Sequence, residues 1–157
     1  MSLNGVLETA RWSAVGLGVF LANYLGGSPA AQFSLVCFWS VVPIAGLTGV
    51  ESVFLAQRAS EQSGYGGGGL AYQRQSGFNN LALAIACLLA YALGWGLMAK
   101  AALMSVLLIF LTLSAANHVY SAVKENNLRP KNLLRPFLTA FLLAVTLPYL
   151  AAALAAA

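Results

Sequence analysis

Five side chains that could take part in chemistry lie inside stretches that are otherwise apolar. They are one carboxylate, three amides and one imidazole: Glu51, Asn79, Asn80, Asn117 and His118. Such groups are costly in hydrocarbon, and in membrane helices they usually face a bundle interior or a wet cavity. We therefore predict that they form the core of a ligand-binding site.

Three of these groups lie at a similar distance along the chain from a basic residue. Glu51 lies seven residues before Arg58, Asn80 six after Arg74, and His118 six before Lys124. At a rise of 1.5 Å per residue, each helical position is roughly 9 to 11 Å from a common basic layer. The three groups can meet if their helices are neighbours, and Gln75 and Tyr120 would extend the cluster toward the basic side.

The chemistry of this cluster is open from the sequence alone. One His and one Glu are too few for a zinc site, which normally has at least three protein ligands, so we predict no metal, and no cofactor is indicated. An acid and base pair of Glu51 and His118 would make the chain an enzyme, which is the less favoured interpretation. Hydrogen bonds that only hold the helices together are the structural alternative.

The composition predicts the medium around these side chains. Hydrophobic residues make up 60% of the 157 positions and charged residues 8%, against roughly 45–50% and about 25% in soluble domains. Lipid must cover this apolar excess, and Cys37 and Cys87 are expected to pack within it as small hydrophobic residues. The net charge of +4 is ascribed to membrane topology and anionic lipid, because no aromatic residues alternate with the basic ones as in nucleic-acid-binding segments.

We predict a single all-α transmembrane bundle over residues 1–157 with five spans, of which the first is short. The predicted spans are 12–27, 32–56, 78–98, 101–123 and 133 to the alanine-rich end, with a glycine-rich loop at 57–77 and a tight turn at 99–100. Five spans place seven basic residues on one side and only Lys100 on the other. Because cytoplasmic loops accumulate Lys and Arg, the N-terminus is predicted to be cytoplasmic.

The motifs around the polar residues resemble those of a family of small bacterial inner-membrane proteins of unknown function. The resemblance covers about residues 33–149 and rests on four segments, at 49–54, 73–81, 115–119 and 127–132. It implies a multi-pass protein of the bacterial inner membrane, and no activity, cofactor or substrate. The family usually has Gly-His where this chain has Glu51-Ser52, a Glu near Gln75, and an Asp on the last helix, where this chain has Thr139 and Ala140. Only Asn80 and His118 therefore match the pattern of polar residues directly.

The favoured function is the binding of a small or lipid-like ligand, or of a partner, through a polar cluster near the cytoplasmic side. The predicted binding residues are Glu51, Gln75, Asn79, Asn80, Asn117, His118 and Tyr120. There are three alternative functions: a small transporter or proton-coupled channel, a membrane-embedded enzyme, and an accessory subunit of a larger complex. Association with a second copy or with a membrane partner subunit is also left open by the sequence.

Overall fold

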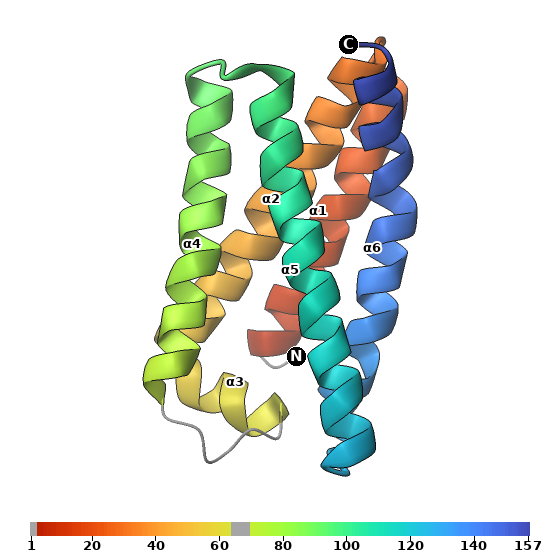
Figure 1. The fold of residues 1–157 in the computed structure, drawn as a ribbon. Helices are drawn as coiled ribbons and strands as arrows, with labels where there is room; N and C mark the ends of the chain where they lie inside the picture. Colours follow the sequence, from red (N-terminus) through yellow and green to blue (C-terminus); the bar gives the residue numbers. More distant parts are fainter. Residues whose placement is uncertain (1–2, 64–69) are drawn as a thin grey trace.

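The computed structural model describes residues 3–63 and 70–157. In this part of the chain all regular secondary structure is α-helix, joined by short connectors. The helices are α1 (Leu3–Leu25), α2 (Pro29–Phe54), α3 (Ala56–Ser63), α4 (Leu70–Ala92), α5 (Gly96–Lys124) and α6 (Pro130–Ala155). The long helices form an upright bundle, and the short α3 lies across one end (Figure 1). The first turn of α1 and the α5–α6 connector are at that end, whereas the C-terminus and the α4–α5 turn are at the other (Figure 1).

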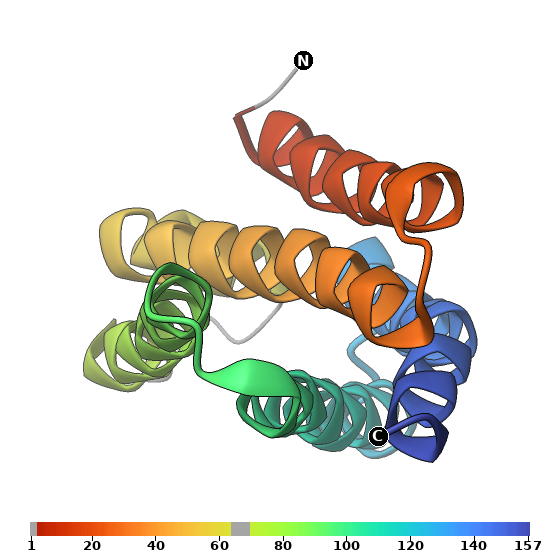
Figure 2. The ribbon, with the colours of Figure 1, turned by 90° about the horizontal axis from the view of Figure 1, so that it is seen from above.

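Helix α2 is the centre of the bundle and packs against every other long helix. Seen from above, α1 lies on one side of α2, and α4 and α5 lie on the opposite side (Figure 2). The core is made of fully buried side chains such as Phe33, Val41, Cys87, Met104 and Leu142. The two cysteines are free thiols in this core.

Helices α2 and α4 are in close contact at two glycines. A Cβ atom at Gly49 would lie 2.6 Å from Cγ of Leu81, and one at Gly77 would lie 2.8 Å from Cγ2 of Val53. Such distances leave no room for a side chain. Small residues at helix crossings let the backbones approach, which is the common device of membrane bundles.

Three helices are long and apolar enough to cross a membrane: Pro29–Phe54, Gly96–Lys124 and Asn132–Ala155. Helices α1 and α4 each have 23 residues, which is also sufficient length, but they carry polar groups such as Glu8 and Arg11, or Gln73 and Arg74. Large apolar side chains cover much of the outer surface, for example Ile109 and Phe137. Exposed apolar surface on this scale is typical of contact with lipid.

Helix α1 is longer than the first span predicted from the sequence, which was short. It begins at Leu3, nine residues before the predicted start at Trp12. The charged residues Glu8 and Arg11 were expected to lie outside the helix. They pair with each other inside it, with Arg11 Nη1 and Glu8 Oε2 separated by 2.6 Å.

The predicted loop at 57–77 contains helix on both sides of its glycines. Residues 57–63 belong to α3 and residues 70–77 to α4, because Ala, Gln, Arg and Glu in these segments are good helix formers. Gly64, Gly66, Gly67, Gly68 and Gly69 lie outside the described residues.

The turn between α4 and α5 lies before the predicted position at 99–100. Gly94 and Gly96 have φ angles of +65° and +82°, which glycine adopts without strain, and α5 begins at Gly96. Lys100 therefore lies inside α5, where its Nζ donates a hydrogen bond of 2.9 Å to Ser34 Oγ. Helix α6 likewise starts earlier than predicted, at Pro130, and Pro136 lies in its interior instead of its first turn.

Candidate functional site

Two carboxylates and one guanidinium form a buried ion-pair network between α1 and α2. Arg11 Nη1 donates to Glu8 Oε2 at 2.6 Å, and Arg11 Nη2 donates to Glu51 Oε2 at 2.5 Å. Glu8 and Arg11 are three residues apart on α1, a spacing that places side chains side by side on a helix. Glu51 is in the last turn of α2. We call these three residues the arginine cluster.

The arginine cluster is enclosed by the bundle. Arg11 and Glu51 are each only 3% exposed, while a third of the Glu8 side chain is accessible. Removing one partner of a buried ion pair destabilises the fold strongly, because the other charge is left uncompensated. Arg11 Nε is buried and has no hydrogen-bond partner, an arrangement that costs free energy unless a water or ligand satisfies it.

Trp12 connects the arginine cluster to α6. Its Nε1 donates a hydrogen bond of 3.0 Å to Glu8 Oε1, so both oxygens of Glu8 accept bonds from α1. The indole ring meets the ring of Phe141 edge to face, with 6.1 Å between the ring centroids. Trp12 thereby holds Glu8 in a fixed orientation next to the gap between α1 and α6.

A hollow lies beside the cluster, among α1, α2, α5 and α6. It contains about 400 Å³ of empty space with its open side included, of which about 30 Å³ admits the centre of a water-sized molecule. That inner part has room for about two waters. Its lining residues are Glu8, Arg11, Trp12, Ile44, Thr48, Leu111, Arg135, Leu138 and Thr139.

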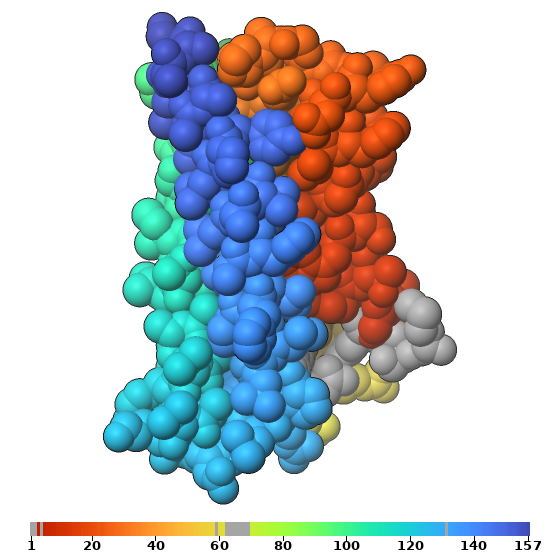
Figure 3. Space-filling model, turned by 90° about the vertical axis from the view of Figure 1, so that its right-hand side faces the viewer, coloured from red at the N-terminus to blue at the C-terminus, as the bar shows by residue number. Residues whose placement is uncertain are grey.

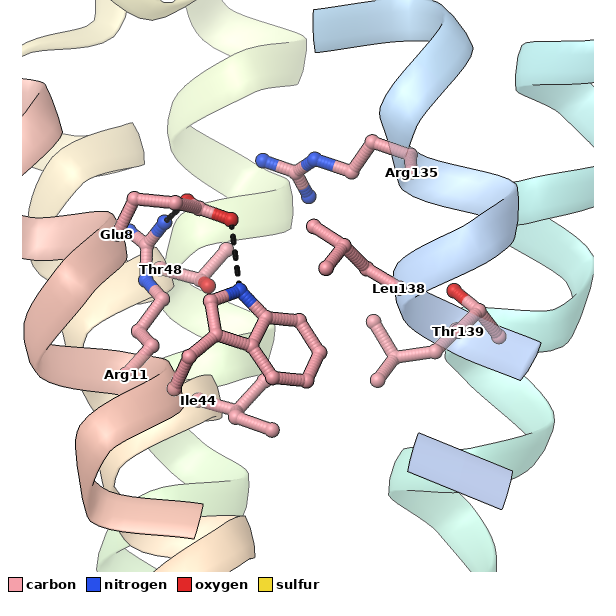
Figure 4. Close-up of a pocket in the computed structure, with 9 residues that line it drawn as sticks. Glu8, Arg11, Ile44, Thr48, Arg135, Leu138 and Thr139 are labelled. Atoms are coloured by element: carbon pink, nitrogen blue, oxygen red, sulfur yellow. Dashed lines mark hydrogen bonds and ion pairs between the residues drawn. The ribbon is translucent and has the colours of Figure 1, made fainter. Parts of the chain in front are cut away.

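The walls of the hollow carry charged residues, two threonines and otherwise apolar or aromatic side chains. The guanidinium of Arg135 extends from α6 across the hollow toward Glu8 (Figure 4). Leu138 and Thr139 follow on the next turn of α6 and face the same space (Figure 4). The hollow thus brings charged, hydroxyl and apolar side chains around one space.

Of the predicted binding residues, Glu51 belongs to the arginine cluster. His118 is buried near the end of α5, where its Nδ1 is hydrogen-bonded to Oδ1 of Asn132. Asn132 is fully buried and donates to the backbone oxygens of His118, at 3.3 Å, and Asn127, at 2.8 Å. This second polar group ties the α5–α6 connector to the start of α6.

The remaining predicted residues lie apart from the hollow's lining. Asn80 is buried and donates to the backbone oxygen of Ser76 in its own helix, at 2.9 Å. The other four have exposed side chains: Gln75, Asn79, Asn117 and Tyr120.

Glu8, Arg11 and Arg135 were not among the predicted binding residues. We placed Arg11 before the first span and Arg135 in the first turn of the last one, and used the two arginines only to infer topology. One signal was available: Glu8 and Arg11 are spaced for pairing on one helix face. A second signal was the position of Arg135, a charged residue directly before the apolar run of the last helix, which begins with Pro136.

The described residues form a helical bundle in which three helices are long and apolar enough to cross a membrane, with a partly charged hollow among α1, α2, α5 and α6. Residues 12–157 match the family of unknown function DUF6790, and the chain belongs to this family. No curated protein and no solved structure matches the chain.

Proposed function

We propose that this chain is a multi-pass membrane protein that binds a small or lipid-like ligand in the hollow beside the arginine cluster. The observation that carries the proposal is the hollow itself, which places charged Glu8, Arg11 and Arg135 around empty space inside an apolar bundle. Concave sites with a few convergent polar groups on apolar walls are typical of ligand binding. Glu51 is retained from the predicted cluster, as the partner that holds Arg11.

The proposed topology has five spans, with α1 and α4 crossing beside the three more apolar helices. It is supported by the arrangement of charges along the bundle. Arg58, Arg74, Lys124 and Arg129 belong to the elements that meet at the end with the N-terminus, whereas Lys100 is near the opposite turn (Figure 1). Cytoplasmic segments are enriched in basic residues, so the hollow lies on the cytoplasmic side of a bacterial plasma membrane.

The test is native mass spectrometry of the protein extracted with its own membrane lipids. We expect a bound molecule that survives mild activation in the wild type and is lost in Leu138→Trp, because the indole fills the hollow. Leu134→Trp is the matched control, since Leu134 is on the same helix, exposed and outside the lining. Thr139→Leu is a second filling variant.

Each variant is first checked for helix content and a single size-exclusion peak. Two results would contradict the proposed function. One is a wild type with nothing bound. The other is equal retention of the molecule in the two filling variants, Leu138→Trp and Thr139→Leu, and in the control Leu134→Trp.

A further inference from the structure

Two thiols lie next to each other in the interior of the bundle. Cys37 on α2 and Cys87 on α4 are the two cysteines of the chain. Both are completely buried, and their side chains form a hydrogen-bonded pair. The sequence indicated only that each packs as a small hydrophobic residue, but the structure brings two sulfur ligands together at one point.

The thiol pair belongs to a polar cluster that reaches partly exposed groups. Lys100 Nζ on α5 donates a hydrogen bond of 2.9 Å to Ser34 Oγ and lies 4.2 Å from the centre of the Tyr91 ring. Cys37 Sγ is hydrogen-bonded to the Tyr91 hydroxyl and donates to the backbone oxygen of Lys100 at 3.4 Å. Ser34, Tyr91 and Lys100 are half-buried. We call these three residues and the two cysteines the thiol cluster.

The number and type of sulfur ligands limit the metals that could bind here. Thiolates select Cu(I), zinc and iron–sulfur clusters, but structural zinc takes four ligands and iron–sulfur clusters normally take four cysteines. In residues 3–63 and 70–157, no group of three or more His, Cys, Asp or Glu side chains is placed to hold a metal. The pair thus supplies two ligands, and Cu(I) is the ion that accepts two thiolates in a linear arrangement.

Lys100 provides the charge that such a complex needs. One Cu(I) and two thiolates together carry one negative charge, which is costly in an apolar interior unless it is paired. The ammonium group of Lys100 is close enough to act electrostatically on both sulfurs. The complex and the lysine together are neutral.

We propose that Cys37 and Cys87 bind one Cu(I) ion, with Lys100 as the compensating charge. Binding replaces two S–H bonds by two S–Cu bonds and releases two protons to water, and the oxidation state of copper does not change. The half-buried Ser34 and Tyr91 each lie about one helical turn from a cysteine of their own helix, which connects the pair with the surface.

The thiol cluster is separate from the hollow. None of its residues is part of the hollow's lining. Figure 3 shows the face formed by α6, in blue, and α1, in red to orange, whereas the thiols lie between α2 and α4, on the side of α2 opposite to α1 (Figure 2). The inference therefore does not depend on the proposed function.

The test is an anaerobic titration of the reduced protein with Cu(I), in competition with the chelator bicinchoninate. We expect one Cu(I) per chain by native mass spectrometry and two sulfur neighbours of copper by X-ray absorption. Cys37→Ala and Cys87→Ala should each weaken binding more than about a hundredfold, which exceeds the usual effect of losing a group that only supports a ligand. Met104→Leu removes another completely buried sulfur at similar volume and should leave the affinity unchanged.

Variants of Lys100 test the compensating charge. Lys100→Met should weaken Cu(I) binding by about tenfold or more, as the loss of a supporting group at a metal site does. Lys100→Arg should retain most of the affinity, because the positive charge is kept. Equal affinities of Lys100→Met and Lys100→Arg would contradict the role of this charge.

Four results would overturn the copper site itself. They are a copper neighbour other than the two sulfurs, equal affinities of the cysteine variants and Met104→Leu, zinc binding as tight as that of Cu(I), and a disulfide between Cys37 and Cys87 in anaerobically prepared protein. Each variant is first checked for helix content and a single size-exclusion peak. If a cysteine variant does not fold, the X-ray absorption spectrum of the wild type still decides the ligand set.

Discussion

Arg11 is the residue on which the candidate site depends most. It joins Glu8 and Glu51 across two helices, and it is almost completely buried. Because two carboxylates share one guanidinium, its removal would leave negative charge inside the bundle. The charge of Arg11 is therefore expected to be a structural requirement as well as part of the binding wall.

Replacement of Arg11 by Met should destabilise the bundle by about 3 to 5 kcal/mol, the usual cost of breaking a buried ion pair. The double variant Arg11→Met with Glu51→Leu should recover most of this loss, because the uncompensated charge on α2 is removed as well. Reversible unfolding in detergent, followed by circular dichroism, measures both values. Equal stability of Arg11→Met and the wild type would show that the ion pair is not buried.

Asn132 has a structural role at the other polar group. Asn132→Ala should cost about 2 to 4 kcal/mol, because it leaves the ring of His118 and the backbone oxygens of His118 and Asn127 without this partner. Asn79→Ala is the control. It is exposed, and its change should be within about 0.5 kcal/mol. Similar losses in the two variants would contradict this assignment.

At the scale of helices, most of the architecture could be predicted from the sequence and most of the boundaries could not. Apolar runs indicated the long helices, and Pro130 marks the first residue of α6. The start of α1 was missed because charged residues normally mark the end of a membrane-spanning helix. Glu8 and Arg11 instead form an ion pair within α1. The candidate site was missed because it depends on the ion pair between Arg11 of α1 and Glu51 of α2. Such a contact between two helices cannot be predicted from residue spacing along one of them.

The crossing of α2 and α4 gives a prediction with an internal control. Gly49→Ala should destabilise the bundle by about 1 to 3 kcal/mol, since its Cβ would overlap Leu81 and the helices would have to separate. Gly46→Ala places its Cβ at 3.6 Å from that of Ala84, an ordinary contact, and should be neutral or slightly stabilising because Ala is the better helix former. Thermal unfolding in detergent compares the two, and equal effects would contradict this helix packing.

Across the described residues the charged hollow lies toward one end of the bundle. The interior toward the other end is mainly apolar, with the Lys100–Ser34 hydrogen bond as a polar contact there. The fully buried side chains include Phe33, Val36, Val41 and Met104. This asymmetry favours binding over conduction, because a transported ion would need polar groups along the entire path.

The proposed topology predicts that the two ends of α5 face opposite compartments. In a background with Cys37→Ala and Cys87→Ala, Leu128→Cys should react with a membrane-impermeant maleimide only from the cytoplasmic side, and Trp95→Cys only from the other. Both positions are exposed. Labelling of both from one side of sealed vesicles would contradict a membrane-spanning α5.

The contact of Arg11 with Glu8 and Glu51 can be tested directly in a bilayer. Solid-state NMR measures dipolar coupling between the Arg11 guanidinium nitrogens and the carboxylate carbons of Glu8 and Glu51. We expect direct contact with both carboxylates. Absence of coupling to Glu51, while contacts between α2 and α4 at Gly49 and Gly77 are preserved, would contradict it.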